Sequence, residues 1–157
     1  MENPRENVFK VENVVDVENI REYIKTKNVK NVIVNGAGFI GIEAAENLAA
    51  LDKLNISLIV RSRVLSSNID EDLAGFVEEN IKDHINLIKN DEIIEVLDDK
   101  VTLKSGSTLP YDLLINAIGV KPNSSLAEKA GLTLTKSGAI DTCLLYTSDA
   151  ADDCCRV

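Results

Sequence analysis

A chain of 157 residues has room for about one domain, and its hydrophobic share of 45% can build a single core. The formal net charge of −9 argues against a nucleic-acid partner, because phosphates require a basic face. No apolar run approaches the roughly 20 residues of a membrane span, and the polar residues 1–10 do not read as a signal peptide. We therefore expect a soluble cytoplasmic protein with no nucleic-acid or membrane partner.

The first half of the chain alternates between helical and extended patterns. Residues 17–27 repeat apolar side chains at helical spacing. Residues 31–35 form a short β-branched run that stops at a glycine, which is typical of a buried parallel strand. Residues 39–51 predict a helix and residues 55–60 a second buried strand, so this stretch indicates a βαβ unit with parallel strands and a right-handed crossover.

The second half starts in the same way and then changes. Residues 70–83 predict a helix with acidic residues in its first turn, and residues 85–88 predict a third parallel strand. Turn signals at hairpin spacing then separate short extended runs, which indicates a small antiparallel meander before one more buried strand. The meander strands are expected at 93–97, 101–103 and 108–109, and the buried strand at 113–117. The fold class is therefore α/β: a Rossmann-like parallel sheet with helices and a small antiparallel β-meander.

The glycine-rich turn Gly36-Ala37-Gly38-Phe39-Ile40-Gly41 carries the main functional signal. It follows a buried strand and opens a helix, as the G-x-G-x-x-G motif does in dinucleotide-binding units. Gly36 would allow the tight turn, Gly38 the close approach of a pyrophosphate, and Gly41 the packing of helix on strand. The alternative is that the glycines only permit a turn. Asn35 is an unusual end for this strand, and we expect its side chain to form a local hydrogen bond.

The type of dinucleotide depends on the residues after the second strand. An acid there would accept a hydrogen bond from the ribose 2′-hydroxyl of NADH. This chain has Val60-Arg61-Ser62-Arg63 instead, and guanidinium groups can bind the 2′-phosphate of NADPH. The hypothesis is therefore that Arg61 and Arg63 favour NADPH over NADH. The alternative is that both are solvated loop charges.

Three stretches give the chain a family resemblance that spans most of residues 8–142. On these residues it resembles the pyridine nucleotide-disulfide oxidoreductase family, and within it the coenzyme A-disulfide reductases and NADH oxidase-like members. The stretches are Gly36 to Glu43, Val101 to Asp112, and Asn116-Ala117-Ile118-Gly119-Val120-Lys121-Pro122-Asn123, the last being similar to the family's A-x-G-x-x-P-N signature.

The resemblance implies roles for further residues. Phe39 and Glu43 would lie near the nicotinamide, and Ala117, Ile118 and Gly119 would bring backbone close to the same end. Phe39 could instead be core, and Glu43 an ordinary first-turn acid. The resemblance also implies that the parent enzyme carries FAD, passes hydride from NADPH or NADH to that flavin, and forms a homodimer.

The resemblance divides the chain into expected regions. Residues 1–30 would connect to the parent's FAD-binding half, and residues 31–142 would be a truncated NAD(P)H-binding domain. Residues 143–157 hold all three cysteines and read as the translation of a transposon-type sequencing adapter. The alternative is that Cys154 and Cys155 form a redox or metal site, but the sequence offers too few further ligands at workable spacing for a metal ion. We expect neither catalytic residues nor a metal site in this chain, and no FAD bound by it.

Two competing functions remain at this point. The chain could be a stand-alone dinucleotide-binding or redox-sensing module without catalysis of its own. A Rossmann dehydrogenase acting directly on a substrate is less favoured, because no catalytic histidine, lysine or tyrosine–lysine pair follows the βαβ unit.

Overall fold

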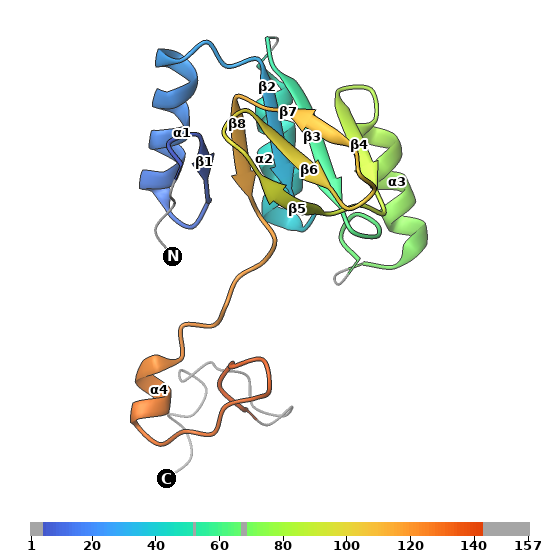
Figure 1. Ribbon diagram of the computed structural model, residues 1–157. Helices are drawn as coiled ribbons and strands as arrows, with labels where there is room; N and C mark the ends of the chain where they lie inside the picture. Colours follow the sequence, from blue (N-terminus) through green and yellow to red (C-terminus); the bar gives the residue numbers. More distant parts are fainter. Residues whose placement is uncertain (1–4, 52, 67–68, 143–157) are drawn as a thin grey trace. The chain divides into compact units, whose positions relative to one another are not determined.

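The computed structural model describes residues 5–51, 53–66 and 69–142 (Figure 1). The chain divides into two compact units, residues 1–119 and residues 120–157, and each is described by itself. The sequence prediction for 143–157, including its three cysteines, lies outside the described residues.

A parallel sheet forms the centre of the first unit. Its strands lie in the order β1-β8-β2-β3-β4, and every adjacent pair is parallel. The strands are β1 (Val8–Phe9), β2 (Asn31–Asn35), β3 (Asn55–Val60), β4 (Ile85–Lys89) and β8 (Leu113–Asn116). Strand β2 lies in the middle of the sheet, with β8 on one side and β3 on the other. In open α/β sheets, ligands bind outside the carboxyl ends of the strands.

Helices pack on one face of this sheet. They are α1 (Val14–Thr26), α2 (Phe39–Ala49) and α3 (Glu71–Ile81). Their buried residues, such as Ile20, Ala45 and Ile81, share one hydrophobic cluster with Val34 and Leu58 of the sheet. Strand residues alternate between the two faces, so every second side chain of β2 and β3 enters this cluster.

A three-stranded antiparallel sheet covers the opposite face (Figure 1). It consists of β5 (Ile93–Val96), β6 (Lys100–Leu103) and β7 (Thr108–Pro110). Val101 and Leu103 from β6 form a second cluster with Ile33, Ile59 and Leu114, the side chains that alternate with those facing the helices. The parallel sheet is therefore buried on both faces, which explains its nearly continuous apolar strands.

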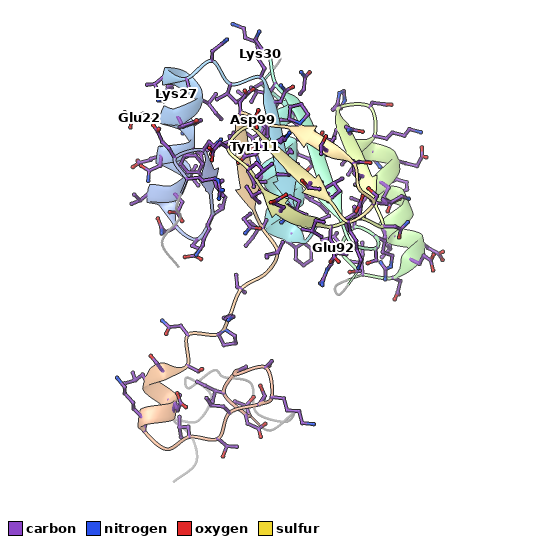
Figure 2. The ribbon with its side chains drawn as sticks, in the orientation of Figure 1. Glu22, Lys27, Lys30, Glu92, Asp99 and Tyr111 are labelled. Carbon is purple, nitrogen blue, oxygen red and sulfur yellow. The ribbon has the colours of Figure 1, made fainter. Side chains whose placement is uncertain are left out.

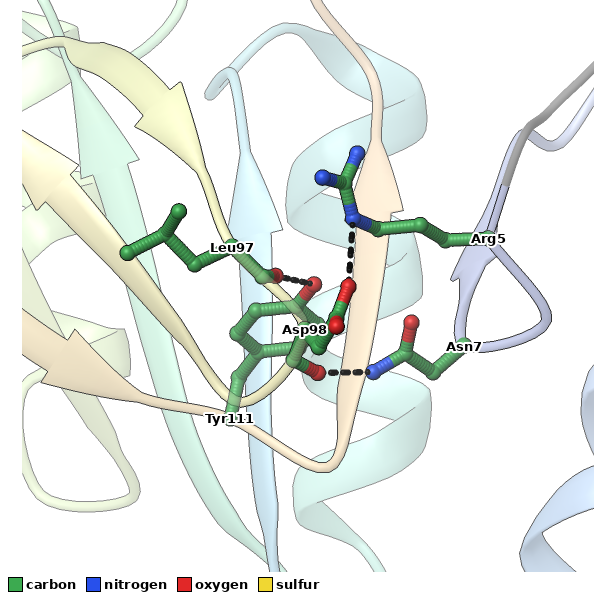
Figure 3. A network of polar contacts seen from close by, with 5 residues as sticks. All are labelled: Arg5, Asn7, Leu97, Asp98 and Tyr111. Atoms are coloured by element: carbon green, nitrogen blue, oxygen red, sulfur yellow. Dashed lines mark hydrogen bonds and ion pairs between the residues drawn. The ribbon is translucent and has the colours of Figure 1, made fainter.

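Polar contacts join the turn between β5 and β6 to the residues just before β1 and to the tyrosine just before β8 (Figure 3). The Tyr111 hydroxyl donates to the carbonyl of Leu97 at 2.7 Å, and Asn7 Nδ2 donates to the carbonyl of Asp98 at 2.9 Å. Arg5 Nε lies 3.2 Å from Asp98 Oδ1. Tyr111 thus joins the turn of the small sheet to the segment before β8, and Asp98 joins the same turn to the start of the chain.

The second unit, as far as it is described, holds α4 (Ser125–Lys129) and a bridge between Leu134 and Ile140. The hydroxyl of Ser124 donates to the carbonyl of Gly138 at 2.6 Å. Across the described ranges of both units, no helix combines the length and apolar character needed to cross a membrane.

The predicted fold class is confirmed, and the element bounds differ in informative places. The first helix begins at Val14 rather than residue 17, because Asn13 and Asp16 form a reciprocal capping box. The strand at Val8–Phe9 was not predicted. Two residues carry no periodicity, and this strand exists because β8 offers it a parallel partner.

Candidate functional site

A cavity of about 450 Å³ opens at the carboxyl ends of β2, β3 and β8. Segments that are distant in sequence line it together. They are the glycine turn (Asn35 to Gly38), the end of β3 with the loop after it (Ile59 to Ser66 without Val64), the residues after β8 (Ala117 to Gly119), and Glu92 with Ile93 at the start of β5. The cavity therefore lies where the parallel strands end, which is where ligands bind in open α/β sheets.

Each motif glycine meets a different environment. Gly36 has φ +104°, and a Cβ there would lie 2.5 Å from the carbonyl oxygen of Ala117. A Cβ on Gly41 would overlap the carbonyl oxygen of Gly36, so only glycine lets α2 pack this closely. Gly38 is different, because its φ is −79° and a Cβ would meet nothing within 4 Å. The turn alone explains Gly36 and Gly41, but it does not explain Gly38.

The start of α2 offers backbone donors next to this open space. Gly38 is the N-cap residue and provides no side-chain hydrogen bond to the helix, and the first turn contains no acid. The first N–H groups of a helix have no partner within the helix, and they carry its positive partial charge. This end of α2 therefore suits an anionic group.

The loop after β3 places its two arginines differently. Arg61 is exposed. Arg63 is half-buried, and its Nη2 donates to the carbonyl of Ser66 at 3.4 Å, while its buried Nη1 has no partner among the described residues. The backbone N–H of Leu65 donates to the carbonyl of Ala37 at 2.8 Å, which ties the loop to the glycine turn. Arg61 thus has the freer guanidinium, and Arg63 helps to hold the loop.

A carboxylate that sequence analysis missed also lines the cavity. Glu92 Oε1 accepts from Lys104 Nζ at 2.8 Å, and the carbonyl of Glu92 accepts from the Lys104 N–H at 2.9 Å. The hydrogen bond and charge of Lys104 hold the pKa of Glu92 below its ordinary value, and the charge of Arg61 acts in the same direction. Because Glu92 follows β4 at the carboxyl edge of the sheet, the strand order was the signal that could have found it.

Asn35 forms a hydrogen bond, but its partner is not local. Its Nδ2 donates to Asn116 Oδ1 at 3.1 Å, and its carbonyl accepts from the Ala117 N–H at 2.8 Å. The expectation of a hydrogen bond within the turn is therefore wrong. The pair forms because β2 and β8 are neighbours in register, which brings Asn35 opposite Asn116.

The predicted site residues fall into two groups. Eight of the positions line the cavity, and four on α2 do not. Lining it are Gly36, Ala37, Gly38, Arg61, Arg63, Ala117, Ile118 and Gly119; not lining it are Phe39, Ile40, Gly41 and Glu43. The side chains of Phe39 and Ile118 are 61% and 68% exposed, so Phe39 is not a core residue. Glu43 is exposed and lies past the first turn of α2.

The described ranges contain no group of three or more histidine, cysteine, aspartate or glutamate side chains arranged to hold a metal ion. His84 is exposed and precedes β4.

Comparison with known proteins gives a consistent assignment. The chain is 38% identical over 144 residues to an NAD(P)H coenzyme A polysulfide/persulfide reductase of Pyrococcus horikoshii, covering 86% of this chain and 31% of that protein. It is 32% identical over 134 residues to a coenzyme A disulfide reductase of Staphylococcus haemolyticus, covering 85% and 30%. The chain thus spans about a third of the length of these relatives.

The fold of the chain is also similar to that of a solved structure. It is an engineered water-forming NADPH oxidase bound to NADPH, derived from an oxidase of Lactobacillus brevis, with 27% identity and a TM-score of 0.77. The match covers 87% of this chain and 31% of that one. Among its replacements, three successive residues change from aspartate, alanine and methionine to alanine, arginine and serine. Residues 2–144 of the present chain match the pyridine nucleotide-disulphide oxidoreductase family, and the chain belongs to that family.

Proposed function

We propose that this chain is the NAD(P)H-binding domain of a flavin-dependent oxidoreductase, and that it binds NADPH in preference to NADH. The observation that carries the proposal is Gly38. Neither backbone conformation nor packing excludes a side chain at Gly38, and the space that a side chain would fill lies open at the start of α2, on the cavity. A pyrophosphate that must approach the backbone at the start of α2 would use that space.

The residues around the cavity fit the three parts of such a nucleotide. The pyrophosphate would bind over Gly38 and the first N–H groups of α2. The adenosine ribose and its 2′-phosphate would lie toward Arg61 and Ser62, with Arg63 supporting that loop. The nicotinamide half would extend past Ala117 to Gly119, toward the exposed Phe39 and the acid Glu43, which lie beyond the cavity. Ile40 and Gly41 would help to hold the start of the helix in place.

Support for NADPH comes from the loop after β3. Its sequence places an arginine and a serine directly after an apolar residue, Val60-Arg61-Ser62. The engineered oxidase bound to NADPH carries the same order, alanine, arginine and serine, in place of an acid-containing segment. An arginine here can form charge-assisted hydrogen bonds to a phosphate, which a carboxylate would repel.

When bound, the nicotinamide supplies a hydride to the FAD of the parent enzyme. The residues of this chain would bind the dinucleotide, orient it along the sheet edge, and present its reactive end beside Phe39. The parent is proposed to be a cytoplasmic homodimer that reduces a disulfide or persulfide. The names of the relatives support the class of substrate. Sedimentation and turnover of the full-length protein test the oligomeric state and the substrate.

A binding titration with matched glycine variants tests the proposal. NADPH fluorescence is followed as the 157-residue chain is added, for the wild type, Gly38→Ala and Gly75→Ala. Both substitutions add a Cβ in open space, but Gly75 lies within α3. We expect saturable binding that weakens about tenfold or more in Gly38→Ala and stays unchanged in Gly75→Ala. Equal binding by all three folded proteins would contradict the proposed pyrophosphate position.

A further inference from the structure

The cavity presents charges of both signs at one end. Arg61 and Ser62 come from the loop after β3, and Glu92 comes from the segment between β4 and β5. Figure 2 shows Glu92 at the end of the three-stranded sheet away from Asp99 and Tyr111. An NADH site usually takes its carboxylate from the end of the second strand, where this chain has arginine. Here a carboxylate reaches the same cavity from a different element.

The position of Glu92 is fixed by its neighbours. Asp91, which is 9% exposed, accepts hydrogen bonds from the Glu92 N–H at 2.9 Å and from the Ser105 N–H at 3.1 Å. Lys104 then holds Glu92 through its side chain and its backbone. Only Oε1 of Glu92 has a partner among the described residues, so Oε2 can accept a further hydrogen bond.

We propose that Glu92 is a specificity-determining residue of the dinucleotide site, and that Lys104 sets how strongly its charge acts. This inference rests on the proposed function. The free carboxylate oxygen would accept a hydrogen bond from the ribose of NADH, and it would repel the 2′-phosphate of NADPH. Lys104 offsets part of that repulsion and leaves Arg61 available to the phosphate. The site is thereby able to bind both nucleotides, with a ratio set by the Glu92–Lys104 pair.

The experiment measures dissociation constants for NADPH and NADH with the 157-residue chain. The variants are Glu92→Gln, Lys104→Met and the double variant. Matched controls are Glu95→Gln and Lys100→Met, which change the same charges on exposed positions of the same sheet outside the cavity. Circular dichroism and thermal melting confirm that each variant is folded.

The two single variants are expected to change the preference for NADPH over NADH in opposite directions. Glu92→Gln raises the preference for NADPH over NADH about threefold to tenfold, and Lys104→Met lowers it by a similar factor. In the double variant, loss of Lys104 has little effect, because the charge that it offsets is gone. Both changes shrink in 0.5 M salt, which screens partly exposed charges.

The experiment distinguishes a failure of the proposed function from a failure of the role proposed for Glu92. If the folded wild type binds neither nucleotide, the proposed function falls and this inference falls with it. If it binds both, but Glu92→Gln alters the preference no more than Glu95→Gln, only the role of Glu92 is overturned. A Lys104→Met effect that persists without the Glu92 charge would also overturn it, since the lysine would then act on the nucleotide directly.

Discussion

Arg61 and Arg63 lie two positions apart in one loop, yet their side chains have different surroundings. Arg61 is exposed at the cavity, whereas Arg63 is half-buried and donates to Ser66. A charge-assisted hydrogen bond to a phosphate contributes about 1.5–3 kcal/mol. We therefore expect Arg61→Ala to weaken NADPH binding about tenfold to a hundredfold and NADH binding about threefold at most. Titrations with both nucleotides measure this, with the exposed Arg21→Ala as the control. Equal losses for the two nucleotides would refute a phosphate contact.

Gly41 and Gly38 belong to one motif but differ in their expected effect on stability. A Cβ on Gly41 would overlap the backbone carbonyl of Gly36, and neither atom is at the end of a flexible side chain. Gly41→Ala is expected to lower the free energy of unfolding by about 2–3 kcal/mol, as overpacking does. Gly38→Ala should lower it by only about 0.5–1 kcal/mol, because alanine is a poorer N-cap than glycine. Gly75→Ala should raise it by about 0.5–1 kcal/mol as a helix-interior substitution. Urea unfolding of the three variants checks this order.

The residues of the site divide into those that sequence could indicate and those that it could not. The glycine turn and Arg61 are local, because a strand, a turn and a helix follow each other directly. Glu92 reaches the cavity only because β4 lies beside β3 with its carboxyl end at the same edge. Asn35 likewise finds Asn116 only through the pairing of β2 with β8. Contacts between elements depend on strand order, which no local pattern contains.

At the scale of elements, Tyr111 attaches the β5–β6 turn to the start of β8. Tyr111 is 3% exposed, and its hydroxyl donates to the carbonyl of Leu97. Tyr111→Phe removes that donor and leaves a carbonyl unpaired, so we expect a loss of about 1–2 kcal/mol in unfolding free energy. Asp98→Ala should cost less than about 0.5 kcal/mol, because the Asp98 side chain in its ion pair with Arg5 is 95% exposed. Chemical denaturation compares the two; a larger loss for Asp98→Ala would contradict this account.

Elements with strong internal patterns were predicted well. The strands at 31–35 and 55–60 match β2 and β3, and the helix predicted from residue 39 begins at Phe39. The short β1 was missed because its two residues are extended only by virtue of pairing with β8. Similarly, α4 has too few residues to show a helical repeat. Sequence therefore indicated the elements with their own periodicity, and tertiary pairing determined the remainder.

At the scale of the whole molecule, two buried side chains, Asp91 and Tyr111, contribute to the pH dependence of stability. Hydrogen bonds from Ser105, and from the backbone of Glu92, hold the pKa of Asp91 below its ordinary 3.8. Its contribution is therefore complete above that value and is lost as the pH falls through the lower pKa of the folded state. Burial raises the pKa of Tyr111 above 10.0, so its contribution is complete below pH 10 and is lost as the pH rises further.

Difference measurements isolate these two groups from the other titrating residues. Unfolding free energies are compared for the wild type, Asp91→Asn and Tyr111→Phe. We expect the advantage of the wild type over Asp91→Asn to shrink as the pH falls below about 4, and its advantage over Tyr111→Phe to shrink above about pH 10. Advantages that stay constant across these ranges would show that neither side chain is coupled to folding through its proton.

The position of β8 has a consequence for how the protein is made. This strand lies between β1 and β2, although it is synthesised after every other strand of that sheet. During translation, β1 has no sheet partner and β2 has an open edge until residues 113–116 leave the ribosome. Such edges invite pairing with other chains, and pairing across long sequence separations is slow. We therefore expect nascent chains that stall before Leu113 to aggregate or to need a chaperone, whereas chains that include Asn116 can close the sheet.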